Sequence, residues 1–360
     1  MKSMKLAHGE VRFPAFFPDA TYAAVRAADA IDAENAHCDG LVMNAYHLML
    51  KPGAGLIKSA GGLHRFTGWN GPILTDSGGY QVFSLIGKDA KFGEIRNDGI
   101  IFRPDGGEKM LLSPEKCIQA QFAYGSDIMI TLDYCIDADA DTATATAAVD
   151  ATIRWAKMCK ETYDHLLAGR KSDMLRPLLF GVIQGGNDRE LRKRCADALI
   201  EIGFDGFGFG GWPLSEGKLC DDMLAYTASL MPDALPKYLL GVGKPEEIVR
   251  CTDMGYDLFD CIIPTREARG GKLYAFDAST IDDIVLSPKA DFYDSVYIID
   301  DKYARDHRPV SDVCDCPVCK RYSRSYLRHL FKLGDASAHR LATIHNLRFY
   351  SMLMEKLRGA

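Results

Sequence analysis

The chain has 360 residues, of which 47% are apolar and 26% are charged, a composition that excludes disordered and collagen-like proteins. It contains no run of about 18 apolar residues that would span a membrane, and its N-terminus has no apolar secretory core, so we expect a cytoplasmic protein. The net charge of −6 is unevenly distributed, because residues 302–358 hold 12 basic and 5 acidic side chains and carry +7. That asymmetry is typical of a segment that meets a polyanion, although a basic helical tail without a special partner gives the same count.

Short apolar runs recur along the chain, and helical segments lie between many of them. The runs are Pro14–Pro18, Leu41–Ala45, Ile73–Asp76, Ile128–Asp133, Leu178–Gln184, Gly206–Gly210, Tyr238–Val242 and Leu258–Ile263. Helices are expected over Ala23–Asn35, from the Ser113-Pro114 cap onward, and over Thr142–Leu167, Asp188–Ile202, Glu216–Leu230 and Pro245–Met254. Eight buried strands that alternate with helices predict an α/β fold, the parallel (β/α)8 TIM barrel, with an open doubly wound sheet as the alternative.

Three of the 11 cysteines, Cys314, Cys316 and Cys319, are grouped in a C-x-C-x2-C pattern. An odd number of cysteines without a signal peptide argues against a disulfide framework, whereas closely spaced thiolates suit a tetrahedral zinc ion. Among the nearby histidines, His339 and His345 lie on a predicted C-terminal helix and are the candidates for the fourth ligand. The sequence therefore predicts one structural zinc ion.

Polar residues stand at the ends of the predicted strands, where barrel enzymes place their active sites. They are Asn44, Asp76, Asp133, Gln184, the Gly210-Gly211 pair and Asp260, followed by Lys244, Arg266 and Arg269 just past strands seven and eight. Two carboxylates can act as nucleophile and proton carrier at a sugar C1′, and a carboxylate beside an amide suits a purine-like base. Tyr80 could stack on such a base, and the arginines could hold phosphates.

Each of these residues also has a structural interpretation. Asp76 and Asp133 could cap turns, Gln184 could be a satisfied core amide, and the arginines could pair with surface acids. Asp260 favours function, because a carboxylate inside an apolar strand is costly unless it is partnered or used.

Several longer motifs make the chain similar to one family. They are Asp76–Ser84 (DSGGYQVFS), Gly181–Gly186 (GVIQGG), Gly241–Pro245 (GVGKP), Phe259–Arg266 (FDCIIPTR), Cys314–Cys319 (CDCPVC) and Thr343–Leu347 (TIHNL). The chain resembles the tRNA-guanine transglycosylases, also called queuine tRNA-ribosyltransferases, from about Pro14 to the C-terminus. The family's C-x-C-x2-C-x25-H zinc motif selects His345 over His339.

The resemblance implies a (β/α)8 barrel over residues 1–285, a zinc-binding insert over 286–338 after the last barrel strand, and a C-terminal helix over 339–360 that carries the fourth zinc ligand. It implies exchange of guanine at the wobble position of tRNA with a G-U-N anticodon for a 7-deazaguanine, in queuosine biosynthesis. It also implies a homodimer, with no membrane partner.

The resemblance also assigns roles to single residues. Asp260 is expected to be the nucleophile that forms a covalent bond to the ribose, and Asp76 the general acid/base. The expected base-binding residues are Ser77, Tyr80, Asp133, Cys135, Gln184, Gly211 and Leu240. Lys244, Arg266 and Arg269 are expected to bind the tRNA.

The chain departs from the family pattern at Tyr134, at Trp212–Glu216 and at Ala45. The Trp212 segment would border the pocket for the 7-substituent, so the incoming base is either the prequeuosine base, which Cys135 favours slightly, or queuine. Two other functions are considered: a non-catalytic paralogue that binds tRNA or base, which retention of Asp260 disfavours, and a barrel enzyme that acts on a free nucleoside.

Overall fold

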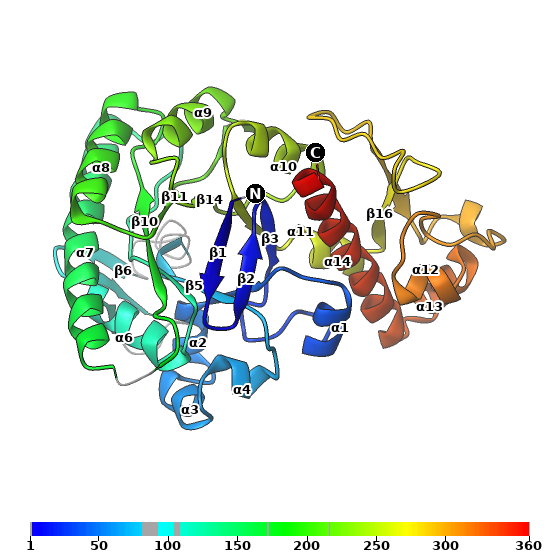
Figure 1. Cartoon of the computed structure of the whole chain (residues 1–360), viewed down its shortest axis with the longest axis horizontal. Coiled ribbons are helices and arrows are strands. Elements are labelled where there is room, and N and C mark those ends of the chain that lie inside the picture. Colours follow the sequence, from blue (N-terminus) through cyan, green and yellow to red (C-terminus); the bar gives the residue numbers. More distant parts are fainter. Residues whose placement is uncertain (1, 81–92, 104–108, 171–172, 216, 360) are drawn as a thin grey trace.

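The computed structural model describes residues 2–80, 93–103, 109–170, 173–215 and 217–359. Its centre is a sheet of eight parallel strands (Figure 1). In sheet order these are β3 (Ala15–Pro18), β15 (Leu258–Cys261), β14 (Lys237–Leu239), β11 (Gly206–Phe209), β10 (Leu178–Ile183), β9 (Ile128–Ile130), β5 (Ile73–Asp76) and β4 (Leu41–Asn44). A parallel bridge between Asp19 and Val42 joins the two end strands, so the sheet closes into a barrel. All eight predicted strands are present, and the open-sheet alternative is wrong.

Helices cover the outside of the barrel, as expected for parallel strands buried on both faces. They are α1 (Ala30–Asn35), α2 (Ala45–Leu50), α3 (Ala54–Ser59), α4 (Leu63–Thr67), α6 (Pro114–Tyr124), α7 (Thr142–Ala168), α8 (Arg189–Ile202), α9 (Asp221–Leu230), α10 (Pro245–Asp253) and α11 (Ile263–Arg269). Ser113 caps α6 through a hydrogen bond from the Lys116 N–H, with Pro114 in its first turn, as the sequence predicted.

Two helix predictions need correction. Helix α1 covers only the last six residues of Ala23–Asn35, because Ala23 and Ala27 take φ angles of 59° and 65°, which no right-handed helix allows. The helix predicted over Glu216–Leu230 begins at Asp221, because the short strands β12 (Leu214–Ser215) and β13 (Lys218–Leu219) pair before it.

The N-terminal hairpin of β1 (Ser3–Leu6) and β2 (Gly9–Arg12) closes one end of the barrel. Its apolar residues Met4, Leu6 and Val11 pack in one buried cluster with interior residues of the barrel strands. At this end Lys2 pairs with Asp257, which precedes β15, at 2.6 Å. Because Asp257 stands before its strand, the hairpin covers the N-terminal ends of the strands and leaves the opposite rim open.

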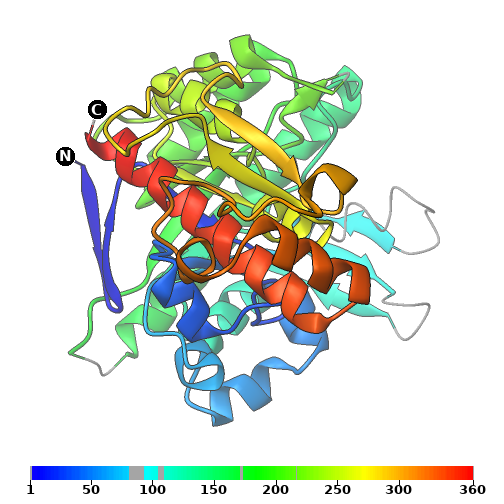
Figure 2. The same cartoon turned by 90° about the vertical axis from the view of Figure 1, so that its right-hand side faces the viewer.

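After β15 the chain forms a second body beside the barrel. It contains β16 (Lys272–Phe276) paired with β17 (Tyr293–Tyr297), a 3-10 turn (Asp301–Tyr303), α12 (Pro317–Arg321) and α13 (Arg324–Leu333), and the chain then ends in α14 (Ala336–Gly359). Helix α14 lies between the barrel and the helices α12 and α13, and it contacts both sides. Figure 2 shows α14 running diagonally in front of the barrel. Residues 342–354 are accordingly buried on all sides.

The β6 (Gly93–Arg96), β7 (Gly99–Phe102) and β8 (Met110–Leu112) strands form a small antiparallel sheet between β5 and α6. In the part of the chain that the structure describes, no helix has both the length and the apolar character needed to cross a membrane.

Candidate active site and candidate metal centre

A cavity of about 150 Å³ opens at the C-terminal rim of the barrel. Residues from β5, β9, β10, β11, β14 and β15, or from the loops that follow them, line it. Of the predicted site residues, the lining contains Asp76, Ser77, Tyr80, Asp133, Cys135, Gly211, Leu240 and Asp260. An apolar cavity of this volume holds one aromatic ring in other proteins, so its size suits a small planar molecule.

Asp260 is held by two hydrogen-bond donors from β14 and the loop after it. The Tyr238 hydroxyl donates to Oδ1 at 2.7 Å, and the Gly241 N–H donates to the same oxygen at 3.0 Å. Burial raises the pKa of Asp260 to about 6, and these two hydrogen bonds oppose the rise because they stabilise the ionised form. Oδ2 accepts no hydrogen bond from the residues described. Asp260 therefore has one oxygen, Oδ1, held by hydrogen bonds and another, Oδ2, that can react or bind.

Asp76 has a different environment. Its Oδ2 accepts a hydrogen bond from the Asn44 Nδ2 at 2.8 Å, and its Oδ1 lies at longer range from the N–H groups of Ala45 (3.3 Å) and Gly78 (3.2 Å). Burial, and after it the nearby charge of Asp260, raise the pKa of Asp76 to about 8. At neutral pH the two carboxyl groups therefore differ, with Asp260 ionised and Asp76 protonated, which is the division of roles that a nucleophile and an acid require.

Asp133 lines another edge of the cavity, and Gln184 lies behind it and binds it. The Gln184 Nε2 donates to Asp133 Oδ2 at 2.6 Å, and the Ser77 hydroxyl donates to Asp133 Oδ1 at 3.3 Å. Burial raises the pKa of Asp133 to about 6. Gln184 does not line the cavity directly, but its buried Oε1 has no hydrogen-bond partner among the described residues, which leaves an acceptor in need of a donor.

Two glycines allow this edge to form. A Cβ on Gly210 would lie 2.5 Å from the Gln184 Nε2, and a Cβ on Gly79 would lie 2.8 Å from the Asp133 carbonyl oxygen. Only glycine permits the backbone to approach the Gln184 side chain and the Asp133 carbonyl so closely. The same loops carry Gly211 and Tyr80.

An aromatic pair stands at the cavity. The rings of Tyr80 and Trp212 are nearly parallel, with centroids 5.9 Å apart, and each side chain is more than two-fifths exposed. Trp212 and Pro213 line the cavity, as the sequence predicted for the Trp212 segment. Residues 81–84 of the Asp76–Ser84 motif and Glu216 lie outside the described residues.

The three predicted tRNA-binding residues lie on the same rim but outside the cavity. Lys244 Nζ pairs with Glu247 at 2.9 Å, and Arg266 pairs with Glu267 at 3.5 Å, so both cations have a local acidic partner. The Nη1 of Arg269 is buried without a hydrogen-bond partner in the described part of the chain.

Sequence reasoning missed two residues of this rim. Tyr238 was assigned only to a strand, although it holds Asp260 directly. Asp19 follows β3, and its charge raises the pKa of both Asp76 and Asp260, though burial dominates each rise. The signal in the sequence is the polar residue directly after the run Pro14–Pro18, because polar residues also follow other barrel strands.

The predicted metal ligands Cys314, Cys316, Cys319 and His345 come together in the second body, with their ligand atoms all within 4.8 Å of one another. The His345 Nδ1 lies 3.7 Å from the Cys316 sulfur and 3.3 Å from the Cys319 sulfur. These values bracket the roughly 3.6 Å that separates nitrogen and sulfur ligands around a tetrahedral zinc ion. The other ring nitrogen, Nε2, donates to the Tyr274 carbonyl at 2.7 Å, which leaves the Nδ1 lone pair for a metal.

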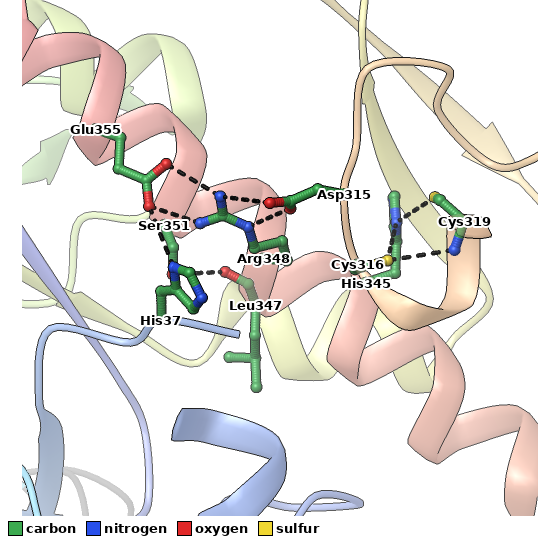
Figure 3. A network of polar contacts seen from close by, with 9 residues as sticks. All are labelled: His37, Asp315, Cys316, Cys319, His345, Leu347, Arg348, Ser351 and Glu355. Atoms are coloured by element: carbon green, nitrogen blue, oxygen red, sulfur yellow. Dashed lines mark hydrogen bonds and ion pairs between the residues drawn. The ribbon is translucent and has the colours of Figure 1, made fainter. Parts of the chain in front are cut away.

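The cluster is tied to α14 by a buried arginine (Figure 3). Arg348 binds Asp315 through two contacts of 2.6 and 3.2 Å, and it binds Glu355 at 2.6 and 3.1 Å. Since Asp315 lies between Cys314 and Cys316, this pairing orients the loop that carries two of the thiols. The residues present therefore fit a structural zinc site with four protein ligands.

Comparison with known proteins agrees with this geometry. The family described as queuine tRNA-ribosyltransferase matches residues 1–360. The chain is 40% identical over 359 residues to the queuine tRNA-ribosyltransferase of Halothermothrix orenii, covering 99% of this chain and 88% of that protein. It is 39% identical over 356 residues to the protein of that name from Solidesulfovibrio magneticus, with 98% and 88% covered. The corresponding figures for Actinobacillus pleuropneumoniae serotype 3 are 41% over 354 residues, with 97% and 85% covered. With its barrel, its paired carboxyl groups and its Cys3His cluster, this chain belongs to the queuine tRNA-ribosyltransferase family of pentosyltransferases.

Proposed function

We propose that this protein exchanges the guanine at the wobble position of tRNA with a G-U-N anticodon for a 7-deazaguanine base. The observation that carries the proposal is the pairing of Asp260, held ionised by Tyr238 and Gly241, with Asp76, whose pKa is raised to about 8. Two carboxyl groups of unlike pKa at one cavity suit displacement at a sugar C1′.

In the first step Asp260 Oδ2 forms a bond to C1′ while the bond from C1′ to guanine N9 breaks. Asp76 donates its proton to the leaving guanine, and the ribose remains covalently attached to the enzyme. In the second step Asp76 takes the N9 proton of the incoming base, whose nitrogen attacks C1′ and releases the Asp260 carboxylate. The two carboxyl groups together carry one negative charge before and after each step, and the proton that leaves with guanine in the first step is replaced by the proton of the incoming base in the second.

The cavity edge supports recognition of a purine-like base. Asp133 can accept the N–H groups of the Watson–Crick edge, and the Gln184 amide together with the Gly211 backbone can meet the remaining donor and acceptor positions. Tyr80 provides a ring for stacking, and Leu240 and Cys135 complete the wall. An unpaired buried acceptor on Gln184 is costly in the free protein, and a bound base would relieve that cost.

For the incoming base we propose the prequeuosine base, 7-aminomethyl-7-deazaguanine, with Cys135 as the residue that favours it. Competition between this base and queuine for tRNA labelled with guanine decides the point. Preferential incorporation of queuine would replace this part of the proposal without affecting the exchange reaction.

Lys244, Arg266 and Arg269 are proposed to hold the anticodon loop, because they follow β14 and β15 on the rim that bears the cavity, and Arg269 has a buried nitrogen without a hydrogen-bond partner among the described residues. Zinc is proposed as the metal of the Cys3His cluster, where it would fold the segment over residues 286–338 against the helix over 339–360 and the barrel over 1–285.

We also propose a cytoplasmic homodimer, for which light scattering of the purified protein gives the mass directly.

The exchange reaction is tested by incubating the protein with radiolabelled guanine and tRNA. Incorporation of label by the wild type and its loss in Asp260→Asn are expected, together with a denaturant-stable protein–tRNA adduct in the wild type alone. Full exchange by Asp260→Asn would remove this residue from the nucleophile role. Binding of tRNA without any adduct or exchange would instead identify a non-catalytic paralogue.

A further inference from the structure

Asp19 belongs to the same interior layer of the barrel as the catalytic pair. Side chains two residues apart on a strand share a face, and Phe17, Val42, Leu74 and Leu258 all pack in one buried cluster inside the barrel. The residues two positions further along those strands are Asp19, Asn44, Asp76 and Asp260. Because β15, β3, β4 and β5 are successive neighbours around the barrel, these four polar side chains form one arc of its upper layer.

The strand register places Asp19 next to Asp260. In the parallel pairing of β15 with β3, Asp260 stands opposite Phe17 and Cys261 opposite Pro18. Asp19 follows Phe17, the residue paired with Asp260, by two positions on the adjacent strand, so it lies one interior layer nearer the C-terminal rim. Its electrostatic effect on both Asp260 and Asp76 agrees with this placement.

Asp19 has unused hydrogen-bonding capacity. Its Oδ1 accepts a short hydrogen bond from the Thr21 hydroxyl, and the backbone N–H of Thr21 also donates to the carboxylate, so the hydrogen bonds seen among the described residues come from Thr21. Arg26 and Arg269 are near enough to lower its pKa, which burial raises overall, but neither of these two described arginines forms an ion pair with it. Burying a carboxylate that is incompletely hydrogen-bonded costs folding free energy, which favours a functional role for Asp19.

The base cavity lies on one side of Asp260, and Asp19 and Asn44 lie outside it. The cavity is lined from β5, β9, β10, β11, β14 and β15 and their loops, and none of the lining residues comes from β3 or β4. A nucleotide whose base fills the cavity and whose C1′ meets Asp260 therefore extends its ribose towards the Asn44 and Asp19 arc. On the other side of Asp260, β14 and its loop contribute Tyr238, already bonded to Asp260, and the apolar Leu240.

Stereochemistry identifies the group that Asp19 would meet. In a β-ribonucleoside the base projects from one face of the sugar, and the 2′-hydroxyl projects from the opposite face. A nucleophile that displaces the base attacks C1′ from the face of the 2′-hydroxyl, on the carbon next to the one that bears it. A carboxylate one strand away from the nucleophile is placed to accept a hydrogen bond from that hydroxyl.

We propose that Asp19, oriented by Thr21, binds the 2′-hydroxyl of the target ribose and makes the site selective for ribose over 2′-deoxyribose. This inference rests on the proposed base exchange. Hydrogen bonds to the 2-hydroxyl strengthen in the transition state of other glycosyl transfers, so part of the selectivity is expected in kcat. The 2′-hydroxyl is also the group by which proteins distinguish RNA from DNA.

The experiment compares two anticodon stem-loops that differ only by a 2′-hydroxyl or a 2′-hydrogen on the target guanosine. The ratio of their kcat/KM values is measured for the wild type, Asp19→Asn, Asp19→Val and Thr21→Val. Losing a hydrogen bond to a charged group should reduce the wild-type ratio on the order of 10- to 100-fold in Asp19→Val, and by less in Asp19→Asn and Thr21→Val. The intrinsic effect of the 2′-substituent on bond cleavage is the same in every enzyme, so it cancels when the ratios of wild type and variant are compared. A shift in the pKa of Asp76 or Asp260 affects both stem-loops alike and cancels within each ratio.

Asp141→Asn is the matched control, since Asp141 caps the exposed start of α7 and should leave the ratio unchanged. If the Asp19 variants slow both stem-loops equally, Asp19 has only a structural role and the inference is overturned. In an Asp260→Asn background, where no bond to C1′ forms, the affinities for the two stem-loops give the same comparison at equilibrium. Absence of exchange by the wild type would instead overturn the proposed function itself.

Discussion

The two central carboxyl groups owe their difference to what surrounds each oxygen. Asp260 receives two hydrogen bonds on one oxygen, whereas for Asp76 burial and the nearby charge of Asp260 outweigh its hydrogen bonds. The proposed exchange needs Asp260 ionised and Asp76 protonated. We therefore expect kcat/KM for guanine exchange to rise as the pH increases through about 6 and to fall as it increases through about 8, following the pKa values of Asp260 and Asp76. A rate that stays level from pH 5 to pH 9 would contradict these roles.

Tyr238 provides a separate test at the residue scale. Its hydroxyl stabilises the ionised form of Asp260, so Tyr238→Phe should raise the pKa of Asp260 and move the acid limb of the pH profile to higher pH. The rate at neutral pH should fall about tenfold, the effect of losing about 1.4 kcal/mol. Tyr256→Phe is the control, because this buried tyrosine donates to the Leu224 carbonyl and does not line the cavity. An unmoved acid limb in Tyr238→Phe would show that its hydroxyl does not act on Asp260.

At the scale of elements, the N-terminal hairpin is held to the closed end of the barrel by Asp127. This buried carboxylate lies 2.8 Å from His8 Nδ1 and 3.3 Å from His64 Nε2, and it accepts the Ile73 N–H at 2.9 Å. The two imidazoles stack with centroids 3.4 Å apart, and His64 Nε2 is also 3.0 Å from the Gly71 carbonyl. The arrangement joins the turn of the hairpin, α4 and the starts of β5 and β9.

Burial raises the pKa of Asp127, but the hydrogen bonds from His64, His8 and Ile73 outweigh burial and hold it below its usual value. A carboxyl group with a lowered pKa stabilises the fold above its unfolded pKa and loses that effect as the pH falls through the folded value. Asp127→Asn should therefore lower the thermal midpoint at pH 7, by an amount equivalent to about 1–3 kcal/mol. Below about pH 4 the difference from wild type should shrink. His329→Ala, on the exposed side of α13, is the control, and an equal loss at both pH values would contradict the explanation.

At the scale of the whole molecule, α14 joins the metal cluster to the barrel. It supplies His345 and contacts β3, α11, β16, α12 and α13. Cys316→Ser should reduce bound zinc from one equivalent towards none, and it should lower the thermal midpoint, because structural zinc contributes directly to folding free energy. Zinc content and thermal unfolding measure both effects, with Cys38→Ser, outside the cluster, as the control. Purified wild type without zinc, or full zinc in Cys316→Ser, would contradict the site.

The positive charge of residues 302–358 is partly neutralised in the folded protein. Six of its arginines form ion pairs among the described residues: Arg308, Arg324, Arg328, Arg340, Arg348 and Arg358. Their partners include Asp32, Asp39 and Asp301, which lie outside the segment. The sequence count therefore exceeds the charge that this segment can offer to a phosphate backbone.

Local information in the sequence determined the strands and the three cysteine ligands, whereas the family resemblance selected His345, and the structure excluded the open sheet. Apolar runs of four to seven residues and closely spaced thiols depend on near neighbours, and they appear where they were predicted. The early helix was wrong because two alanines take left-handed conformations that alanine content does not reveal. Only the tertiary structure shows that the pKa of Asp76 lies above that of Asp260, since this depends on burial and on Tyr238, Gly241 and Asn44, which reach across from neighbouring strands. It also brought Asp19 beside Asp260, because barrel closure makes neighbours of two strands at opposite ends of the catalytic domain's sequence.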